Sequence, residues 1–321
     1  MPDQTMQPLY TILGAGGIIS NELTNHLAAN GHRVRLVSRN PVSYAGITDL
    51  VAADITDEKQ TIAAVKGSDY VILCAGLKYD IKVWSVAWPS IMNNVIRACK
   101  ETGAKLLFFD NVYSYGLVDG PMVETTPYNP ASKKGAVRAR IARQLMDEVQ
   151  AGNITASIAR AADFYGPKAD KTGFLNILIM DKFKTKSTPM WIGRDDLPHS
   201  YTYTPDAGVG MYRLLQDANS WNQVWHLPTA SPAPTGKEYV QMFADAMHVK
   251  AKHMNLGKFM LTITGLFDGT IKEMVEMLYQ NNYPYHFNSD KFEKYFQFTP
   301  TSYQQGIQET VTAAGITSPQ K

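Results

Sequence analysis

Cysteine is scarce in this sequence, and neither sign of charge is in clear excess. The two cysteines, Cys74 and Cys99, are too few for a disulfide framework and lack metal-ligand spacing, so we expect buried, reduced thiols and no metal site. Lys and Arg number 31 against 29 Asp and Glu, which gives a net charge of +2. These charges are scattered, and no basic stripe indicates a nucleic-acid partner.

Long hydrophobic runs are also missing. The longest apolar-looking stretch near the C-terminal end, Phe259 to Phe267, is far shorter than the ~20 residues that cross a bilayer. The first residues, Met1 to Gln4, lack the charged and apolar regions of a secretory signal. We therefore expect a cytoplasmic protein with no membrane partner, in which the 45% of hydrophobic residues build a globular core.

The first half of the chain alternates β-rich runs with helical periodicity, which is typical of a parallel sheet with helices on both faces. Strands are predicted at Tyr10–Leu13, Val34–Val37, Asp49–Ala53, Tyr70–Cys74, Lys105–Phe109 and Thr155–Ala159, and helices at Gly17–Ala29, Asp57–Lys66, Val83–Thr102 and Ser132–Gln150. The predicted fold class is α/β, a doubly wound parallel Rossmann-type sheet of about seven strands.

After Gly166 the rhythm changes, and Pro, Gly and aromatic residues become frequent. Strands are predicted at Thr188–Ile192 and Gln223–His226, and helices at Thr235–Met247 and Leu256–Gln280. We interpret residues 1–166 as one domain and residues 167–321 as a smaller C-terminal substrate-side lobe, interleaved with the end of the sheet.

A glycine-rich turn, Gly14 to Ser20, joins the first predicted strand to the first predicted helix. Glycines let the backbone approach a pyrophosphate closely, and a helix N-terminus offers free N–H groups and a favourable dipole. The turn lies at the start of a βαβ unit, which is the context that a dinucleotide site requires. We therefore predict that residues 1–166 bind NAD(P).

The end of the second strand indicates which cofactor is bound. NAD-selective sites place an Asp or Glu there, on the ribose 2′-hydroxyl. This chain has Ser38 and Arg39, which suit a 2′-phosphate that a carboxylate would repel. The sequence favours NADP over NAD, and the alternative for Arg39 is a solvated residue at a strand end.

Several segments, taken in order, resemble one known family. Leu13–Ser20 corresponds to its TGxxGxxG, Ala53-Asp54 to its adenine-contacting Asp, Cys74-Ala75-Gly76 to its fourth-strand turn, Arg160–Pro167 to R-x-x-N-V-Y-G-P near the nicotinamide, Tyr203–Asp206 to Y-V-D-D, and His226–Pro228 to N-L-G. By this order and spacing the chain resembles, over nearly its whole length, the extended short-chain dehydrogenase/reductase family, in its NAD-dependent epimerase/dehydratase group.

The turn, the end of the second strand and the resemblance together indicate the cofactor-binding residues. These are Gly14, Ala15, Gly16, Gly17, Ile18, Ile19, Ser38, Arg39, Asp54, Ala75, Gly76, Lys133 and Tyr165.

The chain departs from the resembling family at the catalytic residues. Family members use an Asn on the fourth helix, a Ser or Thr after the fifth strand, and Tyr-x-x-x-Lys. Matching the registers puts Trp88, Asn111 and Asn129 in the Asn, Ser/Thr and Tyr positions and keeps Lys133. Asparagine does not titrate and cannot replace the tyrosine as acid/base. The chain therefore resembles an atypical subgroup with a degenerate catalytic tetrad.

Other tyrosines are candidates for the missing phenol. Tyr113 is the first, because alternation along a strand-like segment points it the same way as Asn111, whose amide can donate to a substrate carbonyl. Tyr128 is second, beside the vacant Asn129 position, and Tyr165 is a further source. Lys133 is expected to hold the cofactor ribose and, within ~4–6 Å, to lower the phenol's pKa. The alternatives are aromatic pocket walls, a surface lysine, and Lys134 in place of Lys133.

The predicted function is an NAD(P)-binding oxidoreductase or epimerase/dehydratase-like enzyme acting on a carbonyl or hydroxyl of a small polar, sugar-like metabolite. The alternative is a non-catalytic NADP-binding sensor or regulatory protein. Two helices carry apolar stripes, and in the resembling family these helices pair in a dimer interface; a homodimer is therefore predicted, with packing on the sheet as the alternative. The stripes are Ile91, Val95 and Ala98, and Val137, Ile141, Leu145 and Val149.

Overall fold

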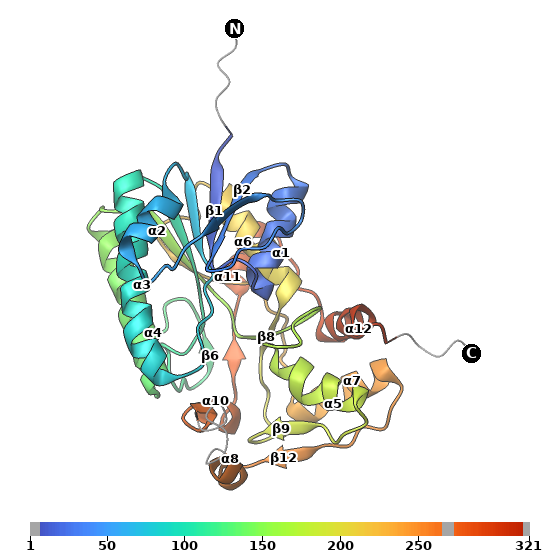
Figure 1. The fold of residues 1–321 in the computed structure, drawn as a ribbon. Coiled ribbons are helices and arrows are strands. Elements are labelled where there is room, and N and C mark those ends of the chain that lie inside the picture. The colour runs from blue at the N-terminus through green and yellow to red at the C-terminus, as the bar shows by residue number, and fades with distance from the viewer. Residues whose placement is uncertain (1–6, 265–272, 317–321) are drawn as a thin grey trace.

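A seven-stranded parallel sheet forms the centre of the molecule in the computed structural model, which describes residues 7–264 and 273–316. The strand order is β3-β2-β1-β4-β5-β7-β11 (Figure 1), and these strands are β1 (Leu9–Leu13), β2 (Arg33–Ser38), β3 (Asp49–Ala52), β4 (Tyr70–Leu73), β5 (Lys105–Asp110), β7 (Ala156–Arg160) and β11 (Val224–His226). The strand order reverses between β1 and β4, and sheets of this kind bind ligands at the carboxyl ends of the strands at such a point. The predicted fold class is confirmed.

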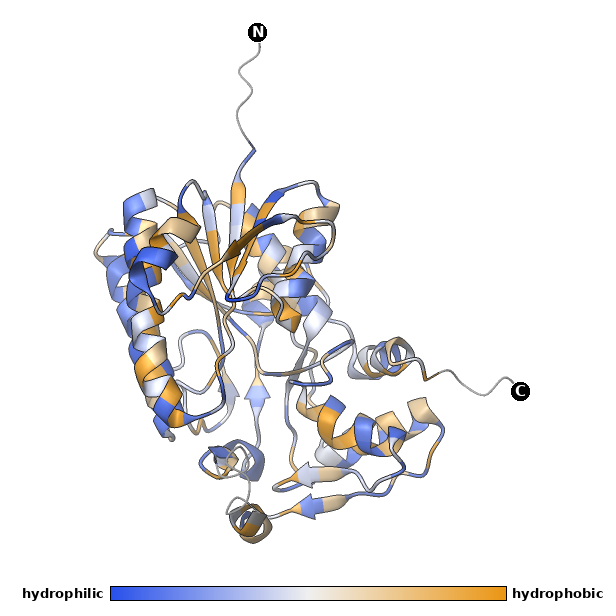
Figure 2. Ribbon diagram, in the orientation of Figure 1, coloured by the Kyte–Doolittle hydropathy of each residue, from blue (hydrophilic) through white to orange (hydrophobic). Residues whose placement is uncertain are grey.

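Helices cover both faces of the sheet. On one face α1 (Ile18–Ala29) packs on α6 (Thr204–Gln216), and on the other α3 (Ile81–Thr102) packs between α2 (Glu58–Val65) and α4 (Lys133–Gln150). The strands are apolar because both of their faces are covered: all five residues of β1 and of β7 are buried. Figure 2 shows the strands mostly in the hydrophobic colour and the helices with hydrophilic residues on their outer sides.

The two apolar helix stripes face this core. Of their seven side chains, Ile91, Val95, Ala98, Ile141 and Leu145 are completely buried within the chain. The other two, Val137 and Val149, are half-buried against the same core. The stripes therefore pack on the sheet, and an interface between two copies would have to use the outer faces of α3 and α4.

Helix α6 was not predicted, because two glycines interrupt its apolar pattern. Both glycines serve close packing: a Cβ on Gly208 would lie 2.6 Å from the Cβ of Glu22 on α1, and one on Gly210 would lie 2.8 Å from Pro228. A glycine that usually indicates a turn here lets two helices approach closely.

Beyond the sheet lies a lobe of short elements, seen in the lower part of Figure 1. Three two-stranded parallel pairs join β8 to β10, β9 to β12 and β6 to β13. The lobe and its connections comprise β6 (Pro121–Met122), β8 (Asp163–Tyr165), η1 (Asn176–Met180), α5 (Asp181–Lys184), β9 (Met190–Ile192), β10 (Tyr201–Tyr203), α7 (Gly236–Met247), β12 (Met254–Leu256), α8 (Lys258–Thr264), α10 (Tyr279–Asn282), β13 (His286–Phe287), α11 (Asp290–Phe296) and α12 (Tyr303–Ala313).

The prediction of one helix over Leu256–Gln280 is wrong. Leu256 ends β12, α8 begins at Lys258, and α10 begins only at Tyr279; residues 265–272 of that prediction lie outside the described residues. The apolar pattern reflects separate short segments that share one small cluster, in which Leu261 and Leu278 pack with Ile192. In the described part of the chain, no helix is both long and apolar enough to cross a membrane.

Candidate active site

The glycine-rich turn between β1 and α1 lies against the end of β4. Gly14 has a φ of +91°, and a Cβ there would lie 2.5 Å from the Cα of Ala75, so a side chain at this position would overlap the backbone. Gly17 precedes α1 without any side-chain cap, and the first turn of α1 contains no acidic residue. The free N–H groups and positive dipole end of this helix fit a pyrophosphate.

A cavity of about 620 Å³ begins at this helix and follows the carboxyl ends of β4 and β5. Seven predicted site residues line it: Gly17, Ile18, Ile19, Ala75, Gly76, Asn111 and Tyr113. Residues of the substrate-side lobe, among them Lys171, Phe174 and Met274, close its far side. The glycine turn and the leading catalytic candidate therefore share one cavity.

The end of β2 lies outside the lining of this cavity. Ser38 accepts a hydrogen bond through its carbonyl from the N–H of Ala53, and Arg39 is exposed. Asp54 accepts hydrogen bonds from the backbone and hydroxyl of Thr56, and these bonds, with the charge of Arg39, hold the pKa of its carboxyl below the usual value. A carboxylate thus stands near the arginine that we expect to bind the 2′-phosphate.

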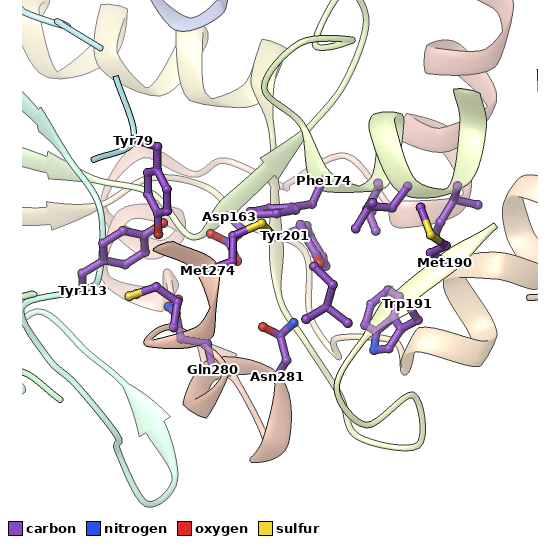
Figure 3. A pocket seen from close by; sticks show the side chains of 15 residues that line it. Tyr79, Tyr113, Asp163, Phe174, Met190, Trp191, Tyr201, Met274, Gln280 and Asn281 are labelled. Atoms are coloured by element: carbon purple, nitrogen blue, oxygen red, sulfur yellow. The ribbon is translucent and has the colours of Figure 1, made fainter. Parts of the chain in front are cut away.

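The phenol of Tyr113 lies beside that of Tyr79, from the loop between β4 and α3, and both side chains line the cavity. Figure 3 shows the two phenols facing each other beside Asp163 and Met274, where the large cavity meets a narrow second cavity of about 30 Å³. Burial, followed by the neighbouring Tyr79 and the charge of Asp163, raises the pKa of Tyr113 well above its usual value. This direction is opposite to the one expected from a neighbouring lysine.

Asn111 is held by its own local backbone. Its Oδ1 accepts a hydrogen bond of 3.1 Å from the backbone N–H of Tyr113, which leaves the amide N–H groups to donate into the cavity. The preceding residue, Asp110, lies at the end of β5 and also lines the cavity, paired with Arg138 of α4 and Arg160 of β7.

Besides Gly14, Ala15 and Gly16, which precede the lining residue Gly17 in the turn, three further predicted site residues from other elements lie outside the lining of this cavity. The Tyr128 hydroxyl accepts a hydrogen bond of 2.6 Å from Arg160, and Tyr165 is buried among Tyr203 and Tyr303 in the core of the lobe. Lys133 is exposed, and its backbone N–H donates to Glu276.

The neighbouring lysine, Lys134, is completely buried. Its ammonium forms ion pairs with Glu273 and Glu276 and lies 4.6 Å from the centre of the Tyr79 ring. Of the two lysines considered for the cofactor ribose, Lys134 is therefore the one that points from α4 into the protein, next to the Tyr79 ring.

Sequence reasoning missed Tyr79, Arg138 and the ion pairs of Asp110. No periodic pattern or spacing predicts them, because each contact joins distant parts of the chain. Asp163 could have been found, since it occupies the Asn position of the R-x-x-N-V-Y-G-P segment. Its Oδ2 lies 3.1 Å from Nε2 of the buried His199.

Comparisons with known proteins point to one family. The family model described as "NAD dependent epimerase/dehydratase family" matches residues 10–225. A dTDP-glucose 4,6-dehydratase of Mycolicibacterium smegmatis is 25% identical over 225 residues, which cover 64% of this chain and 67% of the relative. An uncharacterised protein of Mycobacterium tuberculosis is 33% identical over 102 residues, 30% of this chain; that match spans only 11% of the relative's length.

Among solved structures, a UDP-glucose 4-epimerase of Thermus thermophilus in complex with NAD aligns with a TM-score of 0.77. It is 17% identical, and the alignment covers 95% of this chain and 98% of that one. At this identity the likeness concerns the fold.

Proposed function

The chain belongs to the NAD-dependent epimerase/dehydratase family, and we propose that it is an NAD(P)-binding, epimerase-like enzyme of the oxidoreductase type. It would reduce a carbonyl on a small polar, sugar-like metabolite, with Tyr113 as the proton donor. The observation that carries this proposal is the single cavity that joins the uncapped N-terminus of α1 to the Tyr113 phenol and the Asn111 amide.

The residues at the glycine turn fit a dinucleotide. Gly14 permits the close approach to Ala75, and the first turn of α1 faces the cavity with free N–H groups for the pyrophosphate. When bound, the nicotinamide supplies or accepts a hydride. The chain's own residues then have to bind the substrate, polarise its oxygen and move one proton.

Tyr113 is suited to giving a proton. Its phenol is protonated at neutral pH and can donate to a carbonyl oxygen. Because burial raises its pKa, the phenol is a weak acid and gives up the proton only as that oxygen gains negative charge. The neighbouring Tyr79 helps to enclose the phenol, and the Asn111 amide can donate a second hydrogen bond to the same substrate oxygen. For each molecule of alcohol formed, the hydride adds to carbon and the Tyr113 proton adds to oxygen.

We propose NADP(H) as the cofactor, although the Thermus thermophilus epimerase was solved with NAD. The support is Ser38 in place of an acidic residue at the end of β2, with the exposed Arg39 beside it. Asp54 opposes this preference through its negative charge, so the discrimination against NAD should be moderate.

The domain boundary at residue 166, the cytoplasmic location and the homodimer stay predictions. We assign substrate binding to residues 167–321, because Lys171, Thr172, Phe174 and Met274 complete the cavity opposite the sheet.

Cofactor oxidation tests the proposal. Protein saturated with NADPH is mixed with a panel of aldehydes, ketones and nucleotide sugars, and absorbance of the reduced cofactor is followed. Turnover of at least one carbonyl is expected. If NADPH binds tightly but no compound of the panel oxidises it, the proposed reductase activity is contradicted and a non-catalytic sensor is favoured.

A further inference from the structure

The wall of the cavity contains a buried group of charged side chains that the proposed proton transfer does not use. Nε and Nη2 of Arg138 both bond Oδ1 of Asp110, and Nε of Arg160 lies 3.1 Å from its Oδ2. Asp110 and Arg160 are at most 1% exposed and Arg138 is 3% exposed. In the described part of the chain, Asp110 is the one carboxylate paired with either guanidinium.

Two guanidinium groups thus share one carboxylate, so this group of three side chains carries one positive charge in excess. The polar groups around Arg160 do not compensate for it. Tyr128 and Tyr115 are phenols, and burial lowers the pKa of His226 to about 3, so its imidazole is neutral. A buried uncompensated charge is costly, and the cost falls when an ion of opposite sign binds beside it.

Arg138 is the member of this group with an open edge toward the cavity. The Cζ of its guanidinium lies over the Trp88 ring, 4.2 Å from the ring centre, while Asp110 occupies the edge formed by Nε and Nη2. Its Nη1 finds no hydrogen-bond partner among the described residues and, unlike Nη1 of Arg160, is not closed off by protein atoms. The surrounding cavity wall is largely aromatic, with Trp84, Trp88 and Tyr113.

The position of Arg138 separates it from the phosphates of the cofactor. The pyrophosphate is expected at Gly17 and Ile18, on α1, whereas Arg138 borders Asp110 and Asn111 at the end of β5, where the substrate carbonyl would lie. An anion at Arg138 therefore belongs to the substrate.

We propose that Arg138 is a specificity-determining residue that binds a carboxylate on the substrate, so that the enzyme acts on an acidic sugar-like molecule in preference to its neutral counterpart. This inference rests on the proposed function. Nη1 donates a charge-assisted hydrogen bond to the carboxylate, and Asp110 and Trp88 hold the guanidinium in place for it.

A matched pair of ligands tests the selectivity. Calorimetry with the NADPH-loaded protein compares UDP-glucuronate with UDP-glucose, which differ only in a carboxylate for a hydroxymethyl group. The acidic member should bind about tenfold or more tightly, as expected for one charge-assisted hydrogen bond. Arg138→Met should abolish this difference, and Arg140→Met, an exposed arginine on the same helix, should leave it unchanged.

Two outcomes of this comparison would overturn the proposal. One is equal affinity for the two ligands in the unmodified protein. The other is an equal loss for both ligands in Arg138→Met, which would assign the arginine to the diphosphate. If Arg138→Met does not fold, Arg138→Lys retains the charge and loses the forked geometry; the preference should then shrink, and an unchanged preference would count against the guanidinium contact.

A second measurement needs no sugar and so separates this inference from the proposed function. Because Arg138 lies against Trp88, an anion bound at Nη1 should change tryptophan fluorescence. At constant ionic strength, acetate should change the emission of the NADPH-loaded protein saturably and acetamide should not, and Arg138→Met should remove the effect. Identical responses to acetate and acetamide would refute the anion site at Arg138, even if both nucleotide sugars bind. A response to acetate without binding of either nucleotide sugar would keep the anion site and refute the sugar-like substrate of the proposed function.

Discussion

Replacing Gly14 with alanine should destabilise the protein and weaken its cofactor site for a reason visible in the turn itself. Gly14 has a φ of +91°, which costs an L-residue about 1–2 kcal/mol, as in other left-handed conformations. The new Cβ would also lie 2.5 Å from the Cα of Ala75, and forced overlap of this kind costs about 1–3 kcal/mol more. Together these effects should lower the free energy of unfolding by about 2–5 kcal/mol.

Gly16→Ala is the matched control. Gly16 has a φ of +98°, but no heavy atom lies within 4 Å of its would-be Cβ, so only the cost of the backbone conformation, about 1–2 kcal/mol, is expected. Urea unfolding of both variants and the parent gives the two free energies. Because Ala75 lines the cavity, Gly14→Ala should also weaken NADPH binding in calorimetry. If Gly14→Ala is no more destabilising than Gly16→Ala, the close approach of Gly14 to Ala75 does not require a glycine, and this explanation is wrong.

Three further predictions concern the cofactor, the pH dependence and the assembly. Arg39→Ala should lose about tenfold or more of the preference for NADPH over NADH in calorimetry, and Asp54→Asn should increase that preference; equal affinities in the parent would refute NADP selectivity. Since the folded pKa of His226, about 3, is below its unfolded value, the unfolded chain binds the extra proton and stability should fall by up to about 1.4 kcal/mol per pH unit as pH drops from 6.5 toward 3. His226→Gln should flatten that slope in urea unfolding, and an unchanged slope would assign it to other groups. Sedimentation should show a homodimer, and monomer alone at micromolar concentration would refute it.

The sheet and the glycine turn could be predicted because their signals are local. Each strand is an apolar run buried on both faces, and the turn lies between a strand and a helix that periodicity alone defines. The prediction of one helix over residues 256–280 failed because it also relied on local spacing alone. The apolar residues there belong to separate short segments that pack on Ile192.

The catalytic side of the site could be predicted only in part. Tyr113 and Asn111 both line the cavity, although β5 ends at Asp110 and the two residues lie in a turn, so strand alternation was the wrong reason for expecting it. The loop residue Tyr79 and the pairing of Asp110 with Arg138 depend on contacts between distant segments. The choice between Lys133 and Lys134 depended on where α4 begins. Successive helical residues point about 100° apart, so the start at Lys133, after the Ser132 cap, turns Lys134 inward.

The central claim is that Tyr113 donates the proton, and its substitution by phenylalanine tests it most directly. With a carbonyl substrate from the panel, Tyr113→Phe should lower the rate of NADPH oxidation by about 10²–10⁴-fold, the usual worth of a general acid, with NADPH affinity unchanged. Tyr128→Phe, at the rival phenol bonded to Arg160, and Tyr70→Phe, at the start of β4, should keep nearly full activity. Full activity in Tyr113→Phe, or a comparable loss in Tyr128→Phe alone, would contradict this account.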